Sequence, residues 1–77
     1  MDRVKHEIKE TFGILSTTPG GWNKEINFVS WNDGEPKYDI RQWKPDHTVM
    51  GKGISLTREE AENLYKILGT LFDKVEA

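Results

Sequence analysis

The segment from Tyr38 to Leu56, YDIRQWKPDHTVMGKGISL, decides the fold of this 77-residue chain, because it contains two strand patterns separated by a loop. Residues 37–43 alternate apolar and polar side chains with the period of two that a strand requires. Pro45 ends this strand, and two glycines flank Lys52 at the start of a shorter strand over residues 50–56. The segment therefore predicts two strands and an intervening loop.

A helix is predicted directly after this segment. Thr57 is an N-cap candidate, and Glu60 lies three positions later, as in a capping box. Apolar residues then recur at spacings of three and four, which indicates one broad apolar stripe. The stripe comprises Ala61, Leu64, Tyr65, Leu68, Leu71, Phe72 and Val75. Ile67 lies off the stripe, so we expect the stripe to pack on the sheet and Ile67 to meet a partner chain.

Two more strands are predicted before the segment. The first runs from Val4, and the second runs from Lys24 to Trp31 with apolar residues on both faces, so its buried face stays open. Turn signals at residues 17–21 and 32–36 separate the strands. The residues expected on one face of the first strand are Val4, His6, Ile8, Phe12 and Ile14, with Glu10 out of the pattern.

The predicted fold class is α+β: a four-stranded antiparallel sheet followed by one C-terminal helix, in a single domain over residues 1–77. A chain this short exposes much apolar surface when it folds alone, and a homodimer would relieve that exposure. The sequence has no cysteine, which excludes disulfides and thiolate metal sites and favours a cytoplasmic location. It has no apolar run long enough to span a membrane.

The charge balance limits the possible ligands. With 11 basic and 13 acidic residues the net charge is −2, which predicts no general affinity for duplex DNA or anionic membranes. Any nucleic-acid site must therefore be local. His6 and His47 lack metal-ligand spacing, and no nucleophile or phosphate-loop motif is present. We expect no metal, no cofactor, no small-molecule substrate and no enzymatic activity.

Two strings and a nearby aromatic indicate a family. Asp39-Ile40-Arg41 with Trp43, and Gly51-Lys52-Gly53-Ile54-Ser55-Leu56 ahead of the helix, resemble the positive cofactor four family of transcriptional coactivators, and most closely its small bacterial YdbC-like members. The resemblance covers roughly residues 24–72. It implies a non-enzymatic homodimer that binds single-stranded DNA with little sequence preference in a groove formed by strand faces.

The resemblance also implies roles for individual residues. Arg41, Trp43 and Lys52 match residues that contact DNA, and Trp31 lies near a family aromatic. Trp22, Lys24 and Lys37 are added as candidates because rings stack on bases and cations meet phosphates. The helix residues implied at the dimer interface are Leu64, Ile67, Leu68 and Leu71.

One departure from the family weakens the expected binding. Asn32, Asp33 and Glu35 stand where eukaryotic members carry basic residues. Fewer phosphate contacts would make binding weaker and less salt-dependent, because each neutralised phosphate of a single strand contributes a slope of about 0.7.

Each candidate also has a structural explanation. We expect Lys37, Arg41 and Trp43 to project together from one face, yet Trp43 and Trp31 are alternatively half-buried strand aromatics. Arg41 alternatively forms an ion pair with Asp39. Lys52 is in phase with Ile54 and Leu56, which we expect toward the core, so Lys52 reaches DNA only if a bulge forms at a neighbouring glycine.

The sequence therefore predicts a cytoplasmic homodimer that binds single-stranded DNA, with RNA as a further candidate ligand, in support of transcription, replication or repair. The alternative is a protein-interaction module whose sheet face docks a peptide or a transcription component.

Overall fold

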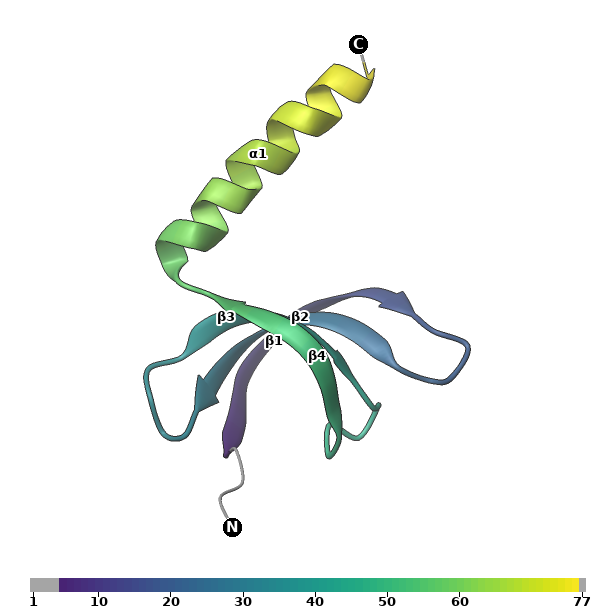
Figure 1. The fold of residues 1–77 in the computed structure, drawn as a ribbon, viewed down its shortest axis with the longest axis vertical. Coiled ribbons are helices and arrows are strands. Elements are labelled where there is room, and N and C mark those ends of the chain that lie inside the picture. The colour runs from purple at the N-terminus through teal and green to yellow at the C-terminus, as the bar shows by residue number, and fades with distance from the viewer. Residues whose placement is uncertain (1–4, 77) are drawn as a thin grey trace.

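The computed structural model describes residues 5–76, and its side chains through residue 73. It contains β1 (His6–Thr17), β2 (Asn23–Trp31), β3 (Lys37–Trp43), β4 (Met50–Leu56) and α1 (Arg58–Glu76). The strands form one antiparallel sheet in the order β1-β2-β3-β4 (Figure 1). The predicted order of four strands and one helix is confirmed. Val4, the expected start of the first strand, lies outside the described residues.

The sheet is arched, and α1 rises from its convex side (Figure 1). The pairing of β1 with β2 shifts register between Ile8 and Glu10, between Thr11 and Gly13, and between Ile14 and Ser16. At each shift β1 advances two residues while β2 advances one, as in a β-bulge. Because bulges bend a strand and increase its twist, three in succession account for the curl of β1 around the sheet.

The concave face of the arch holds the core. Val29 and Trp43 are fully buried there, and the Trp43 ring makes tilted contacts with the rings of His6 and His47, with ring centroids 5.0 and 5.6 Å away. His6 also contacts Trp31, with centroids 6.0 Å apart. We call Trp31, His6, Trp43 and His47 the ring stack. The buried face of β2, which the sequence left open, is thus the face of Val29.

Two carboxylates are buried on this same face, and each has a counter-charge or donors. Asp39, which is fully buried, forms two 2.9 Å hydrogen bonds with the Arg41 guanidinium and accepts a third of 2.8 Å from Ser55 Oγ. Glu25 is 2% exposed and lies 2.8 Å from His47 Nε2. Burying an unpaired carboxylate costs much free energy, so the concave face can be buried only because these contacts are made.

The convex face is open. The rings of Phe12, Phe28 and Tyr38 contact one another on it, with centroids 5.0 to 6.4 Å apart. Ile54, which was expected in the core, is 55% exposed in the single chain. The expectation for β1 was also wrong, because His6 packs on the concave face whereas Phe12 packs on the convex face. The register shift at Ile8 changes the phase of β1 between them.

The helix begins as predicted but packs differently. The capping box is present: Glu60 N donates to Thr57 Oγ1 at 3.1 Å, and Thr57 N donates to Glu60 Oε1 at 2.9 Å. Beyond its first turns, however, the apolar stripe does not pack on the sheet of its own chain, because α1 points away from it (Figure 1). Among the described side chains of α1, the exposed large apolar ones are Tyr65, Ile67, Leu68, Leu71 and Phe72, and Val75 of the predicted stripe lies outside them.

Replacing Trp43 tests whether the ring stack is the core. We expect Trp43→Ala to lower the free energy of unfolding by about 3–5 kcal/mol, because it leaves a cavity beside two imidazole rings. Urea unfolding followed by circular dichroism, at a fixed protein concentration, measures the loss. Trp43→Phe fills part of the cavity and should lose less. Equal midpoints for Trp43→Ala and the unmodified protein would contradict the assignment.

Candidate nucleic-acid interface

The start of β4 contains the bulge that Lys52 requires. Arg41 pairs with Gly53 and Trp43 pairs with Met50, so β4 advances three residues while β3 advances two. Gly53 is obligatory here, because a Cβ atom at this position would clash with the backbone of Ile40 and the Cβ of Arg41. The bulge expected at a glycine neighbour of Lys52 is confirmed, and the Lys52 side chain is exposed.

Three of the predicted cations come together beside this bulge. Lys24 from β2, Arg41 from β3 and Lys52 from β4 line one hollow of about 330 Å³, which we call the basic hollow. The other residues that line it are Ile40, Gly53 and Ile54. Cations over an apolar surface form a site where an anionic chain can be held without a net basic protein.

Arg41 is held rigidly at the edge of the basic hollow. Beyond its two bonds to Asp39, its Nη1 donates to the carbonyl oxygen of Gly51 at 3.3 Å, and its side chain is only 16% exposed. Its guanidinium carbon lies 4.8 Å from the centroid of the Trp31 ring, as in a cation–π contact. The structural ion pair considered for Arg41 is therefore present, and it fixes the direction of the guanidinium.

Trp22 is paired with a cation that the sequence analysis missed. Lys44 Nζ lies 4.8 Å from the centroid of the Trp22 ring and donates to the carbonyl oxygen of Gly20 at 3.3 Å. Trp22 is partly buried, and a Cβ atom on Gly51 would lie 3.6 Å from its ring. Sequence reasoning did not include Lys44, because the strand predicted over residues 37–43 ends one residue before it. Extending the alternation by one residue places Lys44 on the other face.

The loop that carries Lys44 has defined hydrogen bonds. Lys44 N donates to the Val49 carbonyl at 3.0 Å, and His47 N donates to the Lys44 carbonyl at 2.8 Å. Asp46 accepts hydrogen bonds from the backbone and hydroxyl of Thr48, and these bonds lower the pKa of Asp46. The loop therefore places Lys44 in a defined position.

The remaining predicted residues lie elsewhere. The expectation that Trp43 projects from the sheet was wrong: it is fully buried, so its ring is not available to stack on a base in this conformation. Trp31 is partly exposed at the opposite end of the ring stack. Lys37 is exposed beside a different hollow of about 370 Å³, which it shares with Phe28, Tyr38 and Arg58.

Among residues 5–76, no group of three or more His, Asp or Glu side chains is placed to hold a metal ion. In the same range, no helix is long and apolar enough to cross a membrane.

Comparison with known proteins identifies the family. A family model described as Transcriptional Coactivator p15 (PC4) matches residues 19–67, which include Trp22, the basic hollow and the start of α1. A protein of Treponema pallidum (strain Nichols), described as an "Uncharacterized protein", is 43% identical over 70 residues, which are 91% of this chain and 82% of the relative. The family match covers more than half of the chain, so the protein belongs to the PC4 family of transcriptional coactivators, whose members bind single-stranded DNA.

Proposed function

We propose that the protein acts as a homodimer that binds single-stranded DNA at the basic hollow with little sequence preference, in support of transcription, replication or repair. The observation that carries the proposal is that Lys24, Arg41 and Lys52, from three different strands, line one hollow. Phosphates would contact these cations, and bases would stack on nearby rings. Contacts of this kind are made with any base sequence, because they use the backbone and the π-faces.

The side chains divide into mobile and fixed contacts. Lys24 and Lys52 are exposed, so they can follow a flexible phosphate backbone. Arg41 is fixed by Asp39 and offers a rigid cation beside Trp31. Trp22 is the aromatic residue that we place against a base, since it is partly accessible and lies next to Gly51 at the bulge. Trp31 is a second stacking candidate, with Arg41 over its ring.

The surface of the single chain supports the dimer. Its accessible surface is 5982 Å², whereas a compact monomer of 8.9 kDa exposes roughly 4,800 Å². Its radius of gyration is 14.2 Å, against about 11.5 Å for a compact domain of this length. The excess surface exceeds the roughly 800 Å² that each partner buries in a standard interface.

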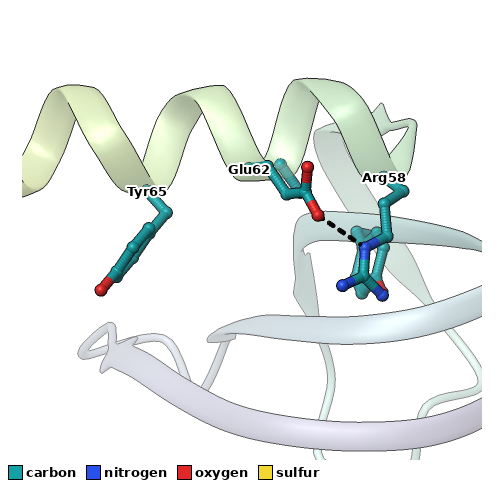
Figure 2. A pocket seen from close by; sticks show the side chains of 5 residues that line it. Arg58, Glu62 and Tyr65 are labelled. Carbon is teal, nitrogen blue, oxygen red and sulfur yellow. Dashed lines mark hydrogen bonds and ion pairs between the residues drawn. The ribbon is translucent and has the colours of Figure 1, made fainter.

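Large apolar side chains are exposed on two surfaces that a second copy could cover. Leu64, Ile67, Leu68 and Leu71 lie on α1, and the convex face of the sheet carries the cluster of Phe12, Phe28 and Tyr38. Between them is an open hollow of about 260 Å³, lined by Tyr38, Ala61 and Tyr65 together with the Arg58–Glu62 ion pair (Figure 2). A second copy that inserts its helix stripe here would bury both surfaces.

Salt dependence tests the nucleic-acid site. We expect an oligothymidine to quench the tryptophan fluorescence of the protein, and the affinity to fall as salt rises. Lys52→Ala should weaken binding and reduce the slope of log affinity against log salt by roughly 0.7, the value for one phosphate contact on a single strand. Lys24→Ala should act similarly.

Lys9→Ala is the matched control, because Lys9 is an exposed lysine on β1 whose ion pair is with Glu7. It should leave the slope unchanged. If the unmodified protein shows no fluorescence change up to high oligonucleotide concentration, the proposal fails and a peptide-docking role is favoured.

Charge placed on the helix stripe tests the dimer. Leu71→Glu should convert the dimer to monomers in analytical ultracentrifugation, because a carboxylate in an apolar interface is costly to bury. Lys66→Glu places a carboxylate on the side of α1 that faces away from Leu71, about 140° around the helix, and should remain dimeric. A monomeric unmodified protein, or a dimeric Leu71→Glu variant, would contradict this interface.

A further inference from the structure

We propose that Glu25, a buried carboxylate on the concave face, is a positioning residue for the nucleic-acid interface: through His47 it holds the loop over residues 44–49 so that Lys44 lies against Trp22. The inference rests on the function proposed above and assigns control of one part of that site. Three consecutive contacts connect Glu25 to the Trp22 ring: Glu25 with His47, His47 N with the Lys44 carbonyl, and Lys44 Nζ with the ring.

The first contact lies inside the core. Glu25 Oε1 accepts a hydrogen bond from Asn27 Nδ2 at 3.1 Å and lies 2.8 Å from His47 Nε2, which donates to the carboxylate. The Glu25 side chain is 3% exposed and that of His47 is 34% exposed. A carboxylate so deeply buried requires its donors, and His47 is the donor that belongs to the loop.

The contact with Glu25 also holds His47 in an unusual backbone conformation. His47 has φ of 61°, in the left-handed region that non-glycine residues seldom occupy. Its ring is held by Glu25 and by Trp43, whose centroid lies 5.6 Å away. Such a conformation persists only where its surroundings enforce it, and here the enforcing contacts are those of the imidazole.

The last two contacts reach the interface. His47 N donates to the Lys44 carbonyl, which closes the turn, and Lys44 N donates to Val49. Lys44 Nζ then lies over Trp22 and bonds to Gly20. A lysine already ordered beside a stacking ring loses less side-chain entropy when it meets a phosphate. The Glu25–His47 contact should therefore raise the affinity for nucleic acid although neither residue touches the ligand.

The contact can be tested without nucleic acid. In NMR spectra the Lys44 ε-methylene protons should be shifted upfield by the Trp22 ring. Glu25→Leu removes the acceptor without leaving an unpaired charge and should move these signals to ordinary lysine values. Glu25→Gln retains a carbonyl acceptor for His47 and should preserve the shift. An unchanged shift in Glu25→Leu would overturn the proposal.

A double-mutant cycle then tests the effect on binding. Glu25→Leu should weaken oligothymidine binding about fivefold, but by less than about twofold when Lys44 is already replaced by methionine, because residues that act through one contact are not additive. An equal loss in both backgrounds, or no loss in either, would refute the positioning role.

Two features keep the outcomes distinguishable. If Glu25→Leu does not fold, His47→Asn replaces it in both experiments, since asparagine tolerates the left-handed backbone but lacks the imidazole ring. If the unmodified protein binds no oligothymidine, the proposed function fails, whereas the proton shifts still report whether Glu25 positions Lys44.

Discussion

The burial of Trp43 against two imidazole rings is the interaction on which the rest of the structure depends. A short sheet has no second layer against which to pack its concave face. The side chains of that face must therefore pack against one another as the sheet curls. The bulges of β1 curl the strand far enough to bring His6 onto Trp43, and the loop after β3 brings His47 against the same ring. The core is thus built from strand curvature rather than from helix packing.

This closure places ionic groups inside the protein and gives them a second role. Asp39 and Glu25 are buried by the same curl and must be satisfied by Arg41 and by His47 with Asn27. Arg41 is thereby held beside Trp31, and His47 shapes the loop of Lys44. The groups that satisfy the two buried carboxylates therefore also fix the positions of two basic residues of the proposed interface.

The convex face has the opposite property. Its rings and the apolar stripe of α1 are exposed in the single chain because the helix points away from the sheet. Within one chain only the start of α1 lies near the sheet, whereas in the proposed dimer two copies cover the exposed surfaces of each other. In the proposed dimer the concave core gives each subunit its shape, and the convex face supplies the association, so the two faces of one sheet have separate tasks.

The number, type and order of the elements followed from the sequence alone, because strand alternation, turn residues and the Thr57 capping box are local signals. The glycines around Lys52 likewise indicated the bulge, and the family strings indicated the ligand class. Only the tertiary structure decided which face of the sheet is buried. Alternation shows that Arg41 and Trp43 share a side, but it cannot show that the sheet curls over that side and buries the indole. For the same reason, the periodicity of α1 identified its stripe but not the surface that the stripe would meet. The contact between Lys44 and Trp22 was likewise decided by the tertiary structure. Proximity across a turn depends on hydrogen bonds that no spacing in the sequence encodes.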